Sequence, residues 1–168
     1  AFEHPNKIPK ISILGPGSLL PPLPEGQKVA RGPAEGEEGT AIEPTIEQSR
    51  ALLEHNLFNH NLITPEALEI RQRMSVGKNF AAFLARKHAA KEKGEKNPED
   101  PWQRVGKCPV PLLLLYGEQD RGQAARRATL AKELHPRLDL QLLPRCAHLA
   151  QWDAAEAFTQ VAGKFLAG

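Results

Sequence analysis

The last third of the chain contains two apolar runs, each followed by a stretch with helical periodicity. Residues 112–116 are four leucines and a tyrosine with no polar alternation, a pattern typical of a strand buried on both faces of a parallel sheet. Residues 138–143 form a second apolar run, and helices are expected at about 123–134 and from Asp153 onward. The apolar stripe of the last helix consists of Phe158, Val161, Ala162, Phe165 and Leu166. This order of elements predicts an α/β fold with helices covering a parallel sheet.

A further strand is expected near the start of the chain. Residues 11–14 are an apolar run that follows Pro9 and ends at Gly15-Pro16-Gly17. The next stretch, residues 20–44, is rich in Pro, Gly and Glu and has no periodic apolar face. It is interpreted as a loop or a partly mobile linker.

Three helices are predicted between the first strand and the next. The first begins after Thr45, which forms a capping box with Gln48, and the second begins after Thr64 and runs to about Ser75. The third begins at about Asn79 and carries Phe80, Phe83 and Leu84. A single βα crossover usually needs only one helix, so three indicate an inserted lid. We therefore expect a core strand in residues 1–19, a loop and helical lid in residues 20–105, and C-terminal core strands and helices in residues 106–168.

The third helix is expected to dissolve into a basic run at residues 86–98. The preferred interpretation of this run is a solvated face and loop, and the alternative is a docking segment for an anionic partner.

Composition narrows the class of protein. The 168 residues are 40% hydrophobic and 25% charged, which is typical of one globular core, and the formal charge of +2 does not favour a nucleic-acid partner. No apolar stretch is long enough to span a bilayer and no signal-peptide pattern is present, so a cytoplasmic protein is expected. Cys108 and Cys146 do not have metal-ligand spacing, and neither a metal nor a cofactor is predicted.

Two titratable residues follow the two C-terminal strands. Asp120 and His148 both lie on loops after strands, at the sheet edge where α/β proteins place catalytic groups, and they occur in the order Asp…His that α/β-hydrolases use. In that chemistry the histidine acts as general base and the carboxylate fixes its tautomer. The alternative for Asp120 is a cap of the helix that starts near Gln123.

Several segments together resemble the meta-cleavage-product hydrolases, α/β-hydrolases that split a carbon–carbon bond in ring-fission products of aromatic degradation. They are Ala1-Phe-Glu-His-Pro-Asn6, Ile11-Ser-Ile-Leu-Gly-Pro-Gly17, residues 21–26, Leu68-Glu-Ile-Arg71, Tyr116-Gly-Glu-Gln-Asp-Arg121 and Cys146-Ala-His-Leu-Ala-Gln-Trp152. The last segment is the most specific. The resemblance covers nearly the whole chain and implies the C-terminal part of the fold, including the lid.

The resemblance also implies roles for single residues. Asp120 and His148 match the triad acid and histidine, Arg71 matches a lid arginine directed at the substrate carboxylate, and Trp152 matches an aromatic wall of the site. The implied substrate is a 2-hydroxy-6-oxo-dienoate, whose C5–C6 bond is hydrolysed after ketonisation and attack at the C6 carbonyl. The sequence departs from the family at Ala147, at Leu149 and at Gly122-Gln-Ala124, which bears on substrate choice.

The serine nucleophile of the G-x-S-x-G elbow is missing from these residues. Ser18 has the wrong frame, because Leu19, Pro21 and Pro22 follow it, and Cys146 is too close to His148 to converge with it on a third point. The segment Ala1-Phe-Glu-His-Pro-Asn6 is interpreted as the end of a helix. We therefore expect the nucleophile in a half of the fold that precedes Ala1 or in a partner chain. A homo-oligomer is also expected. The competing hypothesis is a non-catalytic truncated interaction protein on the same fold.

Overall fold

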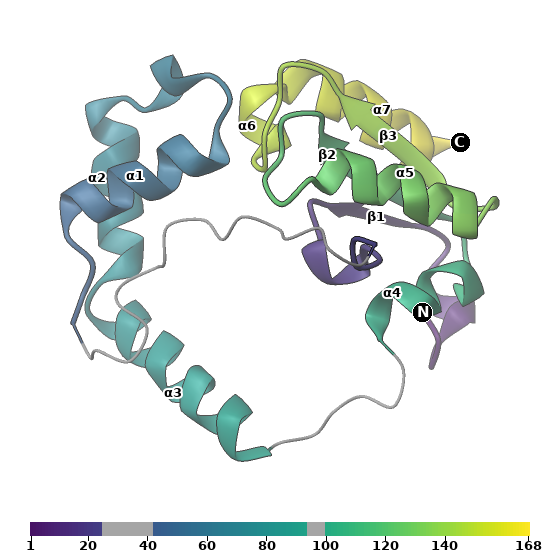
Figure 1. Cartoon of the computed structure of the whole chain (residues 1–168), viewed down its shortest axis with the longest axis horizontal. Helices are drawn as coiled ribbons and strands as arrows, with labels where there is room; N and C mark the ends of the chain where they lie inside the picture. The colour runs from purple at the N-terminus through teal and green to yellow at the C-terminus, as the bar shows by residue number, and fades with distance from the viewer. Residues whose placement is uncertain (25–41, 94–99) are drawn as a thin grey trace. The chain divides into compact units, whose positions relative to one another are not determined.

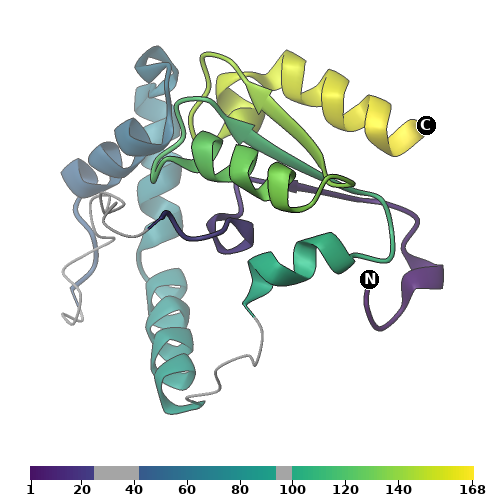
Figure 2. The same cartoon turned by 45° about the vertical axis from the view of Figure 1, so that its right-hand side comes forward.

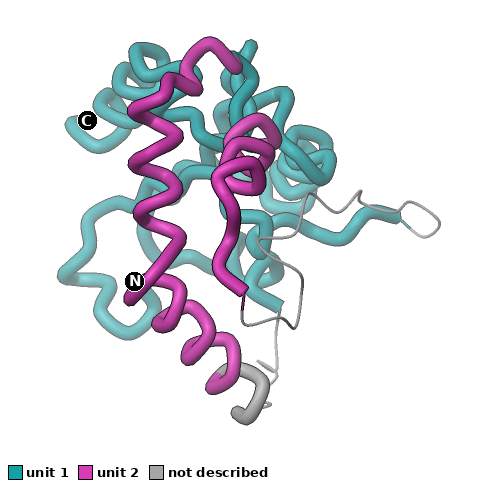
Figure 3. The backbone as a smooth tube through the Cα atoms, turned by 90° about the vertical axis from the view of Figure 1, so that its left-hand side faces the viewer, with its two compact units in different colours: residues 1–30, 56–59, 99–168 teal, residues 31–55, 60–98 magenta. Residues whose placement is uncertain are grey.

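The computed structural model describes residues 1–24, 42–93 and 100–168 (Figures 1 and 2). Within the chain there are two compact units (Figure 3). The sheet unit consists of Ala1–Ala30, Asn56–Asn59 and Glu99–Gly168, and the helical unit consists of Arg31–His55 and His60–Pro98. The domain boundaries expected from the sequence stay a prediction.

The described part of the sheet unit contains a parallel sheet of β1 (Ile11–Leu14), β2 (Leu112–Gly117) and β3 (Asp139–Leu143), in the order β1-β2-β3. Leu114 of the central strand lies opposite Ile13 on one side and Leu140 on the other. All three strands were expected from their apolar runs. The predicted parallel α/β sheet is therefore confirmed.

Both faces of β2 are covered by helices (Figure 1). Leu114 and Tyr116 pack with the buried alanines of α5 (Ala124–Leu134), whereas Leu113 and Leu115 pack with Ala162 of α7 (Ala155–Ala167). Successive side chains of a strand point to opposite faces, so each face of β2 receives apolar side chains only if the run is unbroken. Burial of both faces of β2 explains the unbroken run of leucines. Asp120 lies on the loop that follows the carboxyl end of this strand.

The C-terminal helix differs from the prediction. Instead of one helix from Asp153 there are α6 (Ala150–Asp153) and α7, which Ala154 separates with φ −133° and ψ 46°. The break lets Ala150 pack under Leu143 and Cys146 while α7 follows the sheet. The expected stripe is mostly inward, but Leu166 is 54% exposed. The shorter elements of the sheet unit are η1 (Pro5–Lys7), η2 (Gly17–Leu19), α4 (Pro101–Arg104) and η4 (Val105–Lys107).

The helices of the helical unit are α1 (Ile46–Asn56), whose last residue belongs to the sheet unit, η3 (His60–Leu62), α2 (Pro65–Ser75) and α3 (Lys78–Lys93). Of these, α1 and α2 begin where their caps predict. The Thr45 N–H donates to Gln48 Oε1 at 2.8 Å, and the Gln48 N–H donates back to Thr45 Oγ1 at 3.3 Å, which completes the capping box. Thr64 Oγ1 accepts the Ala67 N–H at 3.1 Å. Both predicted N-caps are confirmed.

The expected end of the third helix is wrong. Residues 86–93 continue α3 and do not form a loop, in keeping with the high helix propensity of Ala, Lys, Arg and Glu. Most of the predicted linker, residues 25–41, and the end of the basic run, residues 94–98, lie outside the described residues.

Candidate catalytic dyad

The loops that carry the two predicted catalytic residues are hydrogen-bonded to each other. The Glu118 N–H donates to Leu143 O and the Gln119 N–H to Cys146 O, both at 3.0 Å. In return, the Cys146 N–H donates to Gln119 Oε1 at 2.8 Å. These bonds join the carboxyl ends of β2 and β3 into one structure.

Gly117 makes this close approach possible. A Cβ atom at this position would lie 2.1 Å from Cys146 O and 2.2 Å from Ala147 O, far inside van der Waals contact. Gly117 therefore lets the loop after β3 reach the loop after β2.

Asp120 and His148 meet at this junction. His148 Nδ1 lies 3.2 Å from both carboxylate oxygens of Asp120, and the side chains of Asp120 and His148 are 3% and 28% exposed. The Arg121 N–H also donates to Asp120 Oδ1, at 2.7 Å. Asp120 therefore lies on the Nδ1 side of the imidazole, within hydrogen-bond reach of it. A carboxylate there favours a proton on Nδ1, which leaves Nε2 able to accept a proton from another group.

Asp120 does not cap the following helix. The N-cap of α5 is Gln123, which has φ 55° and makes no side-chain cap hydrogen bond. The Asp120 side chain is instead turned toward His148, so the capping alternative is wrong.

A second glycine lies against the imidazole. Gly15, directly after β1, has φ +62°, and a Cβ atom there would lie 3.0 Å from Cε1 and 3.1 Å from Nδ1 of His148. The ring is therefore confined between Gly15 and Asp120. Sequence reasoning noted Gly15 only as a strand breaker and missed this contact.

Residues far away in sequence support the His148 loop. The Asn56 carbonyl accepts the N–H groups of His148 and Leu149 at 3.0 and 3.2 Å, and Arg121 Nη1 donates to Asn56 Oδ1. Asp153 accepts the Ala147 N–H at 2.8 Å. Neither Asn56 nor Asp153 was predicted to take part in the site. Asn56 lies far from the loop in sequence, and no local pattern marks Asp153 as the acceptor of the Ala147 N–H.

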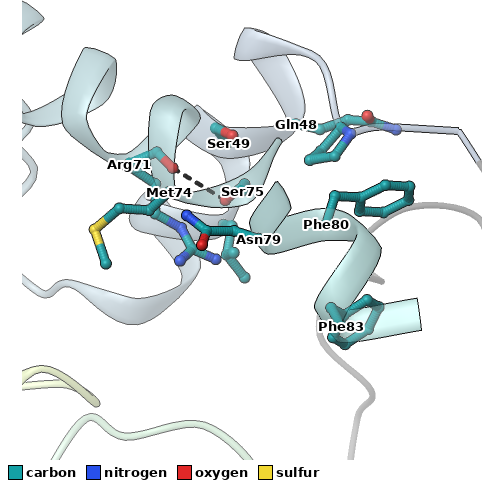
Figure 4. A pocket seen from close by; sticks show the side chains of 10 residues that line it. Gln48, Ser49, Arg71, Met74, Ser75, Asn79, Phe80 and Phe83 are labelled. Carbon is teal, nitrogen blue, oxygen red and sulfur yellow. Dashed lines mark hydrogen bonds between the residues drawn. The ribbon is translucent and has the colours of Figure 1, made fainter. Parts of the chain in front are cut away.

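The other two predicted site residues lie on helices, Trp152 on α6 and Arg71 on α2. Trp152 is half-buried on α6, where its backbone N–H donates to Leu149 O at 2.8 Å. Arg71 lies on α2 and lines a pocket within the helical unit together with Met74, Ser75 and Asn79 (Figure 4). Leu68, three residues before Arg71 on the same helix, is buried. The roles of Arg71 and Trp152 in substrate binding stay predictions.

Cys146 and three serines of the chain are poor candidates for the nucleophile. Cys146 is fully buried, and burial, followed by the nearby charges of Asp153 and Asp120, raises the pKa of its thiol to about 12. Ser49 donates to Gln72 Oε1 at 2.6 Å and Ser75 to Arg71 O at 3.0 Å, while Ser18 is exposed on η2. A buried thiol with a raised pKa is a poor nucleophile.

Residues 1–24, 42–93 and 100–168 contain no group of three or more His, Cys, Asp or Glu side chains that could hold a metal ion. The helices among them are also too short or too polar to cross a membrane.

Comparison with known proteins places this geometry in context. No protein-family model matches the chain. A 2-hydroxy-6-oxo-6-phenylhexa-2,4-dienoate hydrolase of Burkholderia cepacia is 29% identical over 180 residues, which cover 99% of this chain and 57% of the relative. A 2-hydroxy-6-oxononadienedioate/2-hydroxy-6-oxononatrienedioate hydrolase of Comamonas testosteroni is 28% identical with the same coverage. The chain thus spans little more than half the length of these curated relatives.

Solved structures agree on the fold. The 2-hydroxy-6-oxo-6-phenylhexa-2,4-dienoate hydrolase of Rhodococcus sp. strain RHA1 matches with a TM-score of 0.66 and 18% identity, over 99% of this chain and 58% of that one. In sequence the chain is similar over 99% of its length to hydrolases of 2-hydroxy-6-oxo-dienoates, and its fold is that of the C-terminal part of an α/β-hydrolase.

Proposed function

We propose that this chain provides the acid, the general base and the lid of an enzyme that hydrolyses a carbon–carbon bond in a 2-hydroxy-6-oxo-dienoate. The observation that supports the proposal most directly is the contact of His148 Nδ1 with both oxygens of the buried Asp120. The names of the homologous hydrolases supply the substrate class.

In the proposed reaction the dienol is first ketonised, and a serine outside these 168 residues then attacks the C6 carbonyl. His148 Nε2 accepts the serine proton, and Asp120 stabilises the resulting imidazolium. Cleavage of the C5–C6 bond releases a hydroxydienoate, and water then releases the carboxylic acid. Asp120 and His148 act in this scheme only when the missing nucleophile is joined to or paired with this chain.

Arg71 is proposed to bind the carboxylate of the substrate, for which a guanidinium fork is well suited. Trp152 is proposed to form part of the wall around the substrate. The alternative function is a non-catalytic interaction protein in which the dyad has no substrate. What favours the enzyme is the close fit of Gly15 against the His148 ring, since an idle histidine has no need of a confined orientation.

A chimaeric chain tests the proposal. The part of the Burkholderia cepacia relative that precedes the matched region would be joined to these 168 residues, and loss of the visible absorbance of the dienoate would be followed. We expect turnover that falls by about 10³-fold or more in the His148→Ala variant, since removal of a triad member has effects of this size or larger. His88→Ala, on the exposed surface of α3, is the matched control and should keep full activity.

The chimaera must be shown to fold, by circular dichroism and solution mass. A folded chimaera that does not turn over the dienoate, or one whose activity is unchanged in His148→Ala, would contradict the proposed function.

A further inference from the structure

We propose that Asp153 is a positioning residue for His148, and that it acts by holding the segment Asn56–Asn59 against the histidine loop. The inference rests on the proposed function, because it assigns the placement of the general base to a carboxylate outside the dyad.

The Asp153 carboxylate accepts three backbone N–H groups from outside its own helix. Oδ2 accepts from Phe58 and from Ala147, both at 2.8 Å, and Oδ1 accepts from Asn59 at 3.0 Å. One side chain therefore binds two separate stretches of backbone, the Asn56–Asn59 segment and the residue directly before His148. A carboxylate is suited to this because it accepts several hydrogen bonds and has no donor to repel the N–H groups.

The backbone of the histidine loop has no regular secondary structure to hold it. Its four consecutive N–H groups, from Cys146 to Leu149, donate to Gln119 Oε1, to Asp153 Oδ2 and, for the last two, to the Asn56 carbonyl. Of these three acceptor residues, one is Asp153 itself and another is Asn56, which belongs to the segment that Asp153 holds. The position of the His148 backbone therefore depends on Asp153 and on Asn56.

Asn56 also reaches the other half of the dyad. Its Oδ1 accepts from Arg121 Nη1, and the Arg121 N–H donates to Asp120 Oδ1 at 2.7 Å. Asn56 is only 8% exposed, so these bonds are shielded from competing water. Asp153, the segment and both members of the dyad thus form one connected hydrogen-bond network.

The Asp153→Asn variant tests the inference without any need for turnover. An amide replaces one acceptor oxygen by an NH₂ donor, so at least one of the three backbone N–H groups loses its acceptor. The full 168-residue chain would be labelled with ¹⁵N-histidine, and the signal of His148, one of six histidines, would be assigned from a His148→Gln variant. The ¹⁵N shifts then report whether the neutral ring carries its proton on Nδ1 or on Nε2.

We expect His148 to carry its proton on Nδ1 in the wild type and to lose this preference in Asp153→Asn. The rates of amide hydrogen exchange at Phe58, Asn59 and Ala147 should rise by about tenfold or more, because the loss of one charge-assisted hydrogen bond makes local opening easier by about this factor. Asp153→Glu keeps both acceptor oxygens and should restore the Nδ1–H form at least in part. Asp139→Asn, the same change at the exposed start of β3, is the matched control and should change neither measurement.

Two results would overturn the positioning role. One is faster exchange at Phe58, Asn59 and Ala147 with the Nδ1–H form of His148 unchanged. The other is faster exchange along α5 and α7 to the same degree, which would show that Asp153 supports the whole fold. A wild-type His148 without the Nδ1–H form would instead count against the dyad, and so against the proposed function itself.

Discussion

At the scale of single residues, the site depends on two glycines that allow close approach. Gly117 lets the Cys146 and Ala147 carbonyls lie against β2, and Gly15 lets the His148 ring lie against the end of β1. In both cases the neighbour that needs the space is far away in sequence. Gly15 also has φ +62°, a backbone conformation that favours glycine by itself, so its test needs a control with the same φ. Each close approach can be tested by adding a single methyl group.

Gly117→Ala should destabilise the sheet unit by about 2 kcal/mol or more, because the added Cβ overlaps two backbone carbonyls that cannot move independently. Gly163→Ala is the control. Nothing lies within 4 Å of the Cβ added to Gly163 on α7, so the change should be neutral or stabilising by up to about 1 kcal/mol. Urea unfolding followed by circular dichroism measures both, and equal midpoints for the two variants would refute the packing argument.

Gly15→Ala should disturb the orientation of His148 beyond its cost in backbone strain. Gly77 provides the comparison, because it has nearly the same φ, +61° against +62°, and nothing within 4 Å of an added Cβ. Both alanine variants should lose about 1 kcal/mol of stability from the left-handed conformation. Only Gly15→Ala should also lower the activity of the chimaera and alter the ¹⁵N shifts of His148. If the two variants behave alike, Gly15 has no role in placing the ring.

Cys146 should make the fold sensitive to high pH. Burial raises the pKa of its thiol from 9.0 to about 12, so the folded state disfavours the thiolate. A raised pKa contributes stability that is fully present below pH 9 and is lost as the pH rises from 9 toward 12. Urea midpoints measured across this range should fall less steeply in Cys146→Ala than in the wild type. Tyr116, whose pKa burial also raises, acts in the same direction and remains in both proteins, so identical slopes would contradict the role of Cys146.

At the scale of elements, the sequence predicted the features that depend on neighbouring residues in the chain. The apolar runs located the three strands, and the Thr45 and Thr64 caps located the starts of α1 and α2, because these features depend on neighbours within a few residues. The same patterns missed the break at Ala154 and the continuation of α3, which no cap or apolar face marks. The contact of Asp120 with His148 was predictable because parallel strands end at one edge, whereas Asn56 and Asp153 meet through loops with no such rule.

The cap of α2 offers a test at this scale. Thr64→Ala removes the acceptor of the Ala67 N–H and should destabilise α2 by about 1 kcal/mol. Thr159→Ala is the control, since the Thr159 hydroxyl donates to Ala155 O inside α7 and caps no helix. Amide exchange resolved by mass spectrometry would locate the effect. Faster exchange confined to α2 in Thr64→Ala alone is expected, and equal exchange of α2 in both variants would contradict the role of the cap.

At the scale of the whole molecule, β1 is less well covered than its neighbour. All four residues of β1 are half-buried, although three are apolar, while Leu113, Leu114, Leu115 and Tyr116 of β2 are at most 2% exposed. Among the described residues β1 pairs only with β2, so its other edge presents unpaired N–H and C=O groups beside apolar side chains. Such an edge favours pairing with another strand.

We therefore expect these 168 residues, purified alone, to be soluble only with a partner or as an oligomer, and to show no turnover of a ring-fission dienoate. The oligomer follows from the open edge of β1. The inactivity follows from the chemistry, because His148 can take a proton only from a nucleophile, and Cys146, the thiol nearest to it in sequence, is buried with a raised pKa. Light scattering after size-exclusion chromatography should give a mass above the 18.5 kDa of one chain. A stable monomer that bleaches the dienoate, and stops doing so in His148→Ala, would mean that a nucleophile for this histidine lies within the chain.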